Sequence, residues 1–188
     1  MKSMIKRLLA ALLAVAALFA LVGCSKSDKA DAAPKDYTKI LHDARPDEDN
    51  EYYMIFSPGE DGKFTAQYGY SDSYDAAQLD EEIRNMLLPL LNLEEDMYTD
   101  FAASVSGMMV QSYGIAIVKP AEGKQQAVSE ALDAYVQSQM QSMEHYLEDQ
   151  YQIAASSHIS TAPTGEVILV CCENPEAVMN AIKTALAA

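Results

Sequence analysis

Three segments of the chain repeat their apolar residues with the 3.6-residue period of an amphipathic helix. The first runs from Asp75 to Leu88, and Pro89 is expected to end or kink it because proline lacks a backbone donor. The second is longer, from Gln125 to Asp149. The third follows Asn174, the expected N-cap, and has Pro175 in its first position. These patterns predict three helices that each bury one face.

Apolar runs in the second half of the chain predict four strands. They are Phe101 to Val110, Tyr113 to Val118, Tyr151 to Ser160 and Glu166 to Cys172. Together with the helices they predict an α+β domain, an antiparallel sheet with its helices packed on one face. Similar residues after Pro120 and Pro175 suggest a duplicated strand-strand-helix unit. Two similar but unrelated packing units are the alternative.

The segment from residue 36 to 74 is less regular. Apolar residues from Tyr37 to Leu41 predict a short helix that stops before Arg45-Pro46, and an acidic loop is expected from Asp47 to Glu51. Tyr52 to Phe56 and Phe64 to Tyr70 flank a turn that contains Pro and Gly, which predicts a hairpin or a flap.

The N-terminus has the organisation of a secretory signal peptide. Lys2, Lys6 and Arg7 precede fifteen apolar residues from Leu8 to Val22. A helix of that length rises ~22 Å, which is short of the ~30 Å hydrocarbon core of a membrane. The run is therefore interpreted as a signal peptide and not as a membrane-spanning helix.

The next residues, Leu21-Val22-Gly23-Cys24, resemble the lipobox of bacterial lipoproteins. The resemblance implies that the Cys24 thiol receives a diacylglycerol and that cleavage between Gly23 and Cys24 leaves Cys24 as the first mature residue. An ordinary secretory signal that happens to hold a Cys is the alternative. The expected organisation is a signal peptide over 1–23, a lipidated Cys and flexible tether over 24–35, and a single α+β domain over 36–188. Within that domain, 36–74 is a variable N-terminal segment and 75–188 is the core.

The charge of the chain narrows the choice of partners. It has 13 Lys and Arg against 28 Asp and Glu, a formal charge of −15. Nucleic acid is not expected as a partner, because phosphate-binding surfaces need clustered Lys and Arg. The expected location is the extracytoplasmic face of the cell membrane, where the protein contacts the membrane through the diacylglycerol on Cys24.

Three stretches in the body of the chain carry a family resemblance. They are Asp36-Tyr37-Thr38-Lys39-Ile40-Leu41 through Arg45-Pro46, Tyr113-Gly114-Ile115-Ala116 with Lys119-Pro120-Ala121-Glu122-Gly123-Lys124, and Gln141-Ser142 through Tyr146-Leu147 to Asp149-Gln150-Tyr151. From Asp36 onward the chain resembles an uncharacterised family of bacterial lipoproteins, common in Firmicutes and catalogued as domain of unknown function 4358. The resemblance implies a lipid-anchored extracytoplasmic domain and no particular reaction.

Tyrosines provide the strongest candidate for a binding site. The chain has 11 Tyr and no Trp, and Tyr52, Tyr53, Tyr68, Tyr70 and Tyr74 crowd one segment. Such rings are favoured at binding surfaces, where they contact ligands or protein partners. The alternative is that they simply cover the sheet or a neighbouring helix.

Metal and redox sites have weaker support. His145 and Glu148 lie one helical turn apart, but further zinc ligands are missing nearby. The acidic residues from Asp47 to Glu51 lack the Gly and terminal Glu of a calcium loop. Cys171 and Cys172 are adjacent in a strand, so their side chains should point to opposite faces as buried thiols. No metal and no cofactor is expected.

The sequence contains no recognisable set of catalytic residues. The chain has no Gly-x-Ser-x-Gly elbow, no P-loop and no Rossmann glycine pattern. The leading hypothesis is a non-catalytic module at the cell envelope that binds a protein or a small molecule. An enzyme or accessory subunit that acts on cell-envelope material is the alternative.

Overall fold

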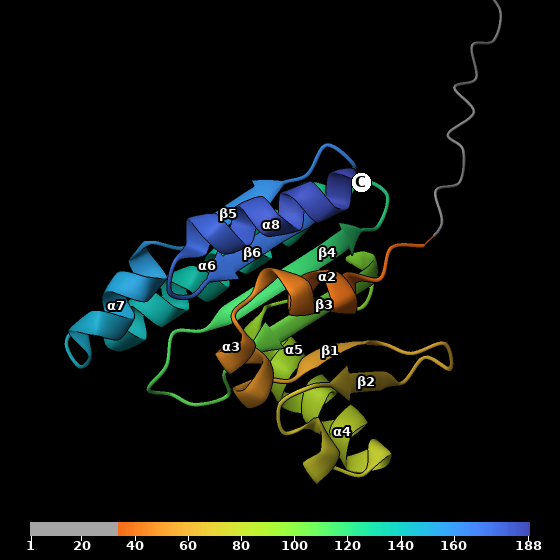
Figure 1. Cartoon of the computed structure of the whole chain (residues 1–188), viewed down its shortest axis with the longest axis horizontal. Helices are drawn as coiled ribbons and strands as arrows, with labels where there is room; N and C mark the ends of the chain where they lie inside the picture. Colours follow the sequence, from red (N-terminus) through yellow and green to blue (C-terminus); the bar gives the residue numbers. More distant parts are fainter. Residues whose placement is uncertain (1–33) are drawn as a thin grey trace, which may run out of the picture. The chain divides into compact units, whose positions relative to one another are not determined.

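A six-stranded antiparallel sheet with the order β2-β1-β3-β4-β6-β5 forms the centre of the computed structural model, which describes residues 34–188 (Figure 1). The strands are β1 (Ile55–Pro58), β2 (Phe64–Gln67), β3 (Tyr98–Val105), β4 (Gly114–Pro120), β5 (His158–Thr161) and β6 (Val167–Cys171). The predicted hairpin in the N-terminal segment is confirmed as β1 and β2. Gly23 and Cys24, the predicted cleavage and lipidation residues, lie outside the described residues.

Helices connect and cover the strands. They are α2 (Tyr37–Ala44), α3 (Asp47–Tyr52), α4 (Ala76–Glu82), α5 (Leu88–Leu90), α6 (Gln125–Met143), α7 (Glu148–Ala155) and α8 (Pro175–Ala187). A 3₁₀ turn, η1, spans Ser71–Ser73, and a π-helical stretch, η2, spans Ile83–Leu87. Within residues 34–188 no helix is both long and apolar enough to cross a membrane.

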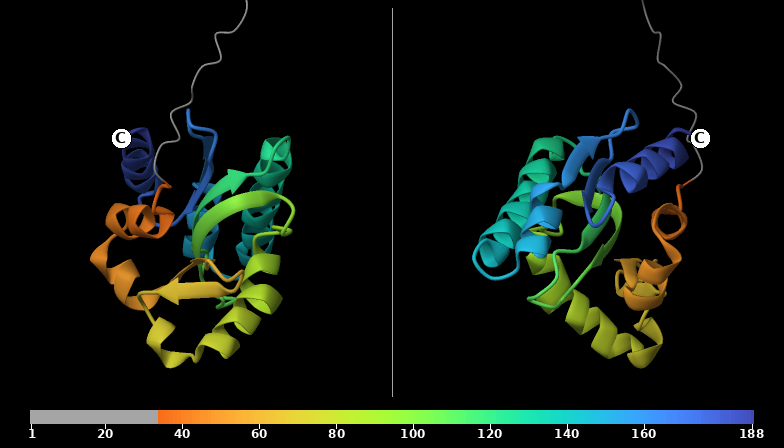
Figure 2. Two further views of the ribbon diagram at one scale, coloured as in Figure 1. Left: turned by 90° about the vertical axis from the view of Figure 1, so that its right-hand side faces the viewer. Right: turned by 60° about the vertical axis from the view of Figure 1, so that its left-hand side comes forward.

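The α+β class is confirmed, but the prediction that the helices pack on one face is wrong. On β4, Ala116 and Val118 belong to a core cluster with α6, whereas Ile115 and Ile117 belong to a second cluster with α2 and α8. Figure 2 shows α2 and α8 on one side of the sheet and α6 on the other. Strands buried on both faces explain why β4 and β6 are apolar at nearly every position.

The proposed duplication of a strand-strand-helix unit also fails. β4 and β6 are antiparallel neighbours, so a two-fold axis that exchanged them would stand perpendicular to the sheet. Such a rotation keeps the helices that follow the two strands on the same face. Because α6 and α8 lie on opposite faces, the halves are two similar packing units and not copies related by symmetry.

Four local predictions need correction. The acidic segment predicted as a loop is helix α3, which begins directly after Pro46. The long helix ends at Met143, and the strand predicted from Tyr151 to Ser160 is mostly helix α7, with Glu148 and Asp149 in a first turn that favours acidic residues. The strand predicted from Phe101 to Val110 ends at Val105. Pro89 lies near the end of its helix as predicted, one residue before the last residue Leu90 and just after the π-helical stretch Ile83–Leu87.

The start of α8 is as predicted, but its cap is not. Asn174 has a left-handed backbone, with φ of 56°, and its side chain makes no capping hydrogen bond. Pro175 occupies the first turn, and the predicted face of Val178, Ile182 and Leu186 is buried. The backbone therefore turns sharply between β6 and α8, and this turn lines a cavity in the surface.

Candidate functional site

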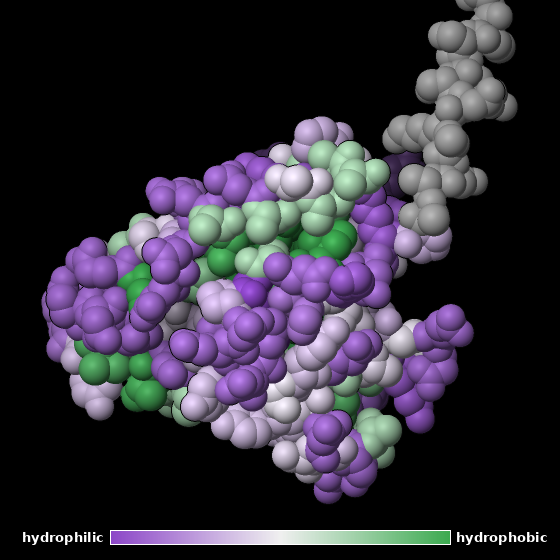
Figure 3. All heavy atoms as spheres, viewed as in Figure 1, coloured by the Kyte–Doolittle hydropathy of each residue, from purple (hydrophilic) through white to green (hydrophobic). Residues whose placement is uncertain are grey.

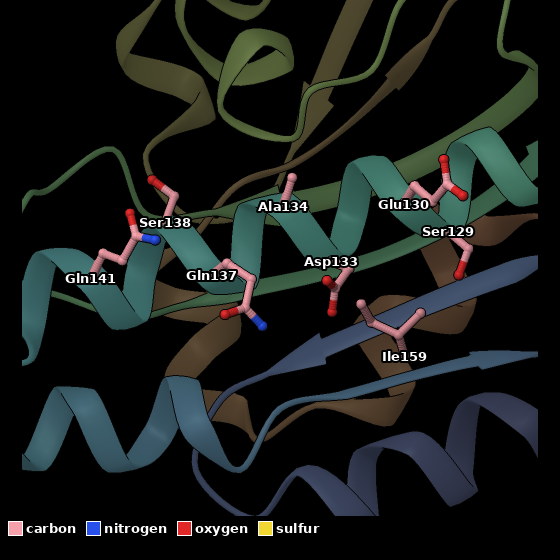
Figure 4. Close-up of a pocket in the computed structure, with 8 residues that line it drawn as sticks. All are labelled: Ser129, Glu130, Asp133, Ala134, Gln137, Ser138, Gln141 and Ile159. Atoms are coloured by element: carbon pink, nitrogen blue, oxygen red, sulfur yellow. The ribbon is translucent and has the colours of Figure 1, made fainter.

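The surface has two hollows of interest. The larger, about 670 Å³, lies between the outer face of α6 and the edge strand β5 (Figure 4). Small or polar side chains of α6 line it, with Ile159 of β5 as the apolar wall. Most of the lining side chains already face solvent, so it is an open surface groove with no buried polar group to hold a ligand.

The second hollow is smaller, about 360 Å³, and more enclosed. Five parts of the chain line it: the start of α3, Tyr53, the residues before β4, one side of α7, and the junction of β6 with α8. These parts meet at one end of the sheet (Figure 1). We call this hollow the α3–α8 cavity and regard it as the candidate site.

A buried arginine organises the chain beside the cavity. Arg45 is 5% exposed and forms no ion pair with any carboxylate of residues 34–188. Its Nε donates to Asn50 Oδ1 at 2.7 Å, and its Nη2 donates to the Tyr53 carbonyl at 2.6 Å. Its Nη1 donates to Ser104 Oγ at 2.7 Å and to the Tyr113 hydroxyl at 3.2 Å. One guanidinium thus ties the C-terminal part of α3 to the sheet.

Two tyrosines stand beside this arginine. The rings of Tyr53 and Tyr113 stack with centroids 3.8 Å apart, and both residues line the α3–α8 cavity. The Tyr53 hydroxyl donates to Gln111 Oε1 at 3.0 Å, which holds the loop before β4 against α3. Burial raises the pKa of both phenols, so both remain neutral hydrogen-bonding groups.

The charged groups that line the cavity are all acidic: Glu48, Asp49 and Glu173. Glu48 and Glu173 are exposed, whereas Asp49 is half-buried. Burial raises the pKa of the Asp49 carboxyl, although the attraction of Arg45 acts in the opposite direction. Its ionised form is therefore less well solvated than a surface carboxylate, and it would gain from an additional positive partner.

One polar side chain at the cavity has no partner. Ser112 is 2% exposed, and its Oγ makes no hydrogen bond with any part of residues 34–188. Its backbone N–H donates to Gln150 Oε1 at 2.9 Å, which fixes the residue against α7. A buried hydroxyl without a partner costs ~1–3 kcal/mol. Less than 1 Å² of this Oγ is accessible, so it is an unpaired group enclosed in the wall of the cavity and not part of its accessible surface.

The cysteine at the cavity is not an activated nucleophile. Burial raises the pKa of the Cys172 thiol to about 12 and that of Cys171 to about 11. Cys171 packs in the core cluster of α6 and Cys172 in that of α8, so the two free thiols point to opposite faces. The thiolate needed for nucleophilic attack or metal binding is strongly disfavoured at neutral pH.

The structure does not gather the five predicted tyrosines into one site. Tyr53 lines the α3–α8 cavity. Tyr52 and Tyr70, both 58% exposed, form an edge-to-face pair on the surface, and Tyr68 lies against the ring of His42. Tyr74 lies apart, at a shallow hollow beside α4.

The alternative metal ligands are also dispersed. Among residues 34–188 no three His, Cys, Asp or Glu side chains come close enough to hold an ion. Asp49 lines the α3–α8 cavity with Glu48, not with Asp47 or Glu51, because these residues lie on helix α3 and not on a loop.

The sequence analysis did not identify Arg45 or Ser112 as candidate functional residues. Arg45 is the only Lys or Arg between Lys39 and Lys63, a stretch otherwise rich in acids, and it precedes Pro46. That isolation is a usable signal for a buried cation. Nothing in the sequence distinguishes Ser112 from its neighbouring serines.

A family match accompanies this geometry. The sequence model described as "Domain of unknown function (DUF4358)" matches residues 71–172, more than half of the chain. The chain belongs to the DUF4358 family. No curated protein and no solved structure matches it.

The DUF4358 match covers only part of the candidate site. Ser112, Tyr113, Gln150 and Cys172 lie inside the matched residues. Arg45, Asp49 and the rest of α3 precede them, and Glu173 and Asn174 follow. The cavity is thus completed by segments on both sides of the region that defines the family.

Proposed function

We propose that this DUF4358 protein is a lipoprotein held at the extracytoplasmic face of the cell membrane by a diacylglycerol on Cys24. The proposal is supported by the basic start, the fifteen-residue apolar run and Leu21-Val22-Gly23-Cys24, read together. From Asp36 onward the chain has 26 acidic and 7 basic residues, so an anionic membrane surface would repel the folded body. Figure 3 shows a face of that body that is largely hydrophilic. The acyl chains would then provide the membrane attachment.

Replacement of Cys24 tests this anchor. The Cys24→Ala variant should lose metabolic labelling by a fatty acid and should keep its signal peptide, because the acceptor thiol is gone. Labelling is followed on a gel after expression in bacteria. Ser25→Ala, a neighbouring change that keeps the thiol, should label normally. Equal labelling of Cys24→Ala and the parent chain would contradict the proposal.

We further propose that the protein is a non-catalytic binding module whose α3–α8 cavity holds a small polar molecule. The single observation that carries this proposal is the enclosed α3–α8 cavity itself, whose lining combines the half-buried Asp49 carboxyl and the stacked rings of Tyr53 and Tyr113 with the apolar Pro46 and Ile153. A volume of about 360 Å³ lies in the lower part of the range for small-molecule sites.

Native mass spectrometry of the full chain, purified gently from a bacterial envelope in mild detergent, tests this function. The parent chain should carry a reproducible mass excess beyond its lipid, and Asp49→Asn, which removes the charge of a lining carboxylate, should retain less of it. Asp133→Asn, the same change in the open groove on α6, should match the parent. A protein without any additional mass, and without affinity for any small molecule tested, would contradict a binding role for the cavity.

A further inference from the structure

The two outer edges of the sheet differ in how they are closed. At the edge formed by β2, the Phe64 N–H donates to Asp80 Oδ1 of α4 at 2.7 Å, so a helix occupies that side. At the other edge, β5 pairs with β6 alone, and no strand of residues 34–188 lies on its far side. The four residues of β5 include neither Lys nor Pro, two residues that protect exposed edges from pairing. The edge of β5 is therefore open to a further strand.

The register of β5 against β6 shows which of its backbone groups are free. The Ala162 N–H, just after β5, donates to the Glu166 carbonyl at 2.8 Å, and Ser160 occupies the next position of the same kind. In an antiparallel pair, residues that bond to the neighbouring strand alternate with residues whose N–H and C=O point away from it. Ile159 and Thr161 therefore direct their N–H and C=O groups away from β6. An added strand would pair with these two residues.

The open groove of about 670 Å³ lies beside this strand and has α6 as its other wall. Figure 4 shows α6 passing along β5, with Asp133, Gln137 and Ile159 directed into the space between them. The lining residues of α6 run from Ser129 to Gln141, which is ~18 Å of helix and the length of about five residues of extended strand. An extended peptide needs no buried polar group in such a groove, because the free strand edge supplies its hydrogen bonds.

The charged residues that line the groove are both acidic. They are Glu130 and Asp133, and neither forms an ion pair within residues 34–188. Glu130 accepts a hydrogen bond from the neutral Gln126 side chain, and no Lys, Arg or His is among the lining residues. A second copy of this chain, with its formal charge of −15, would place the same two carboxylates against them. The charges therefore favour a peptide that carries Lys or Arg.

We propose that an extended segment of a partner protein, with Lys or Arg side chains, adds to the sheet at the free edge of β5 and lies in the groove beside α6. Its backbone pairs with Ile159 and Thr161, and a cationic side chain lies near the carboxylates of Glu130 and Asp133. This site is separate from the α3–α8 cavity, because the two share no lining residue. The inference therefore does not depend on the proposed binding of a small molecule.

Fluorescence polarisation of the labelled peptide acetyl-Val-Lys-Val-Lys-Val-amide, titrated with the full chain in mild detergent, tests this inference. The parent chain should bind the peptide. Thr161→Pro should weaken binding about fivefold or more, because it removes the N–H that faces the added strand and keeps the hydrogen bonds between β5 and β6. Thr161→Val keeps that N–H, so it is the matched control and should bind like the parent. The same peptide with Glu in both Lys positions should bind about tenfold more weakly, because its charges are repelled.

A charge variant on the α6 wall keeps the test decisive if circular dichroism shows that Thr161→Pro is unfolded. Gln137→Lys adds a positive charge to the groove and should weaken binding of the Lys peptide about two- to fivefold. Gln152 is exposed on α7 and does not line the groove. Gln152→Lys adds the same charge there and should bind like the parent.

Equal affinity of the parent, Thr161→Pro and Gln137→Lys would overturn the inference, as would equal affinity of the parent for the Lys and Glu peptides. Self-association of the parent chain in analytical ultracentrifugation that is lost in Thr161→Pro would also overturn it, because a second copy would then occupy the edge. Failure of the parent to bind either peptide would overturn it as well. The small-molecule proposal would stand in each case, because native mass spectrometry tests it at the other site.

Discussion

At the scale of single residues, Gly114 shows how closely the walls of the candidate site are packed. It begins β4 directly after Tyr113, and a Cβ added there would lie 2.6 Å from the Tyr135 hydroxyl and 2.7 Å from Tyr135 Cε1. That hydroxyl donates to the Tyr113 carbonyl at 2.8 Å, and Tyr135 is 1% exposed. The absence of a side chain at Gly114 thus lets α6 approach the strand and hold Tyr113 in place.

Substitution of this glycine should therefore be costly. Gly114→Ala should lower the free energy of unfolding by about 1–3 kcal/mol, because the buried Tyr135 ring must move or the strand must shift. Urea denaturation followed by circular dichroism measures the change. Gly107→Ala is the matched control, since a Cβ at Gly107 meets nothing within 4 Å. Equal stability of the two variants would show that Tyr135 adjusts without cost.

At the scale of elements, a buried carboxylate joins helix α2 to the turn between β5 and β6. Glu166, which is 4% exposed, precedes β6 and accepts a hydrogen bond from the Tyr37 hydroxyl of α2 at 3.0 Å. The Thr164 hydroxyl donates to its other oxygen. Two segments far apart in the sequence, α2 and the turn between β5 and β6, are therefore held by one side chain.

Removal of the phenol hydroxyl tests this connection. Tyr37→Phe keeps the ring and should lower the free energy of unfolding by about 1–3 kcal/mol, because a buried carboxylate loses a donor. Tyr146→Phe is the control, since Tyr146 is 72% exposed, and it should change stability by less than about 0.5 kcal/mol. Both are measured by urea denaturation at neutral pH. A Tyr37→Phe chain as stable as Tyr146→Phe would mean that water replaces the hydroxyl.

The sequence best predicts the elements that have a long apolar pattern or whose ends are marked by Pro or Gly. Helix α8 follows from its three-residue apolar face and Pro175, and the β1–β2 hairpin follows from the Pro and Gly between its strands. Helix α7 is mispredicted because Tyr151 and Ile153 alternate with polar residues, as in a strand. Its helical state also depends on packing against α6, and no local pattern contains that contact.

At the scale of the whole molecule, the sequence could not predict which helix packs on which face of the sheet or which residues form the site, for the same reason. Both depend on contacts between distant segments. The α3–α8 cavity combines α3, the residues before β4, α7 and the start of α8. Of its lining residues only Tyr53 belongs to the predicted tyrosine site, while Glu48, Asp49 and Cys172 were considered only for the weaker metal and redox sites. Continuous apolar runs in β4 and β6 do indicate burial on both faces, so they were a better guide to the layers than the similarity of the two helices.

The position of β6 between β4 and β5 governs the time at which the protein can finish folding. The β1–β2 and β3–β4 hairpins join neighbouring segments and can pair while the rest of the chain is still being synthesised. The free edge of β4 must wait for the residues from Val167 onward. During that interval β4, which ends up paired on both sides, has an open edge that is available to other nascent chains. The strand order therefore implies that the growing chain needs protection from such pairing until β6 has been synthesised.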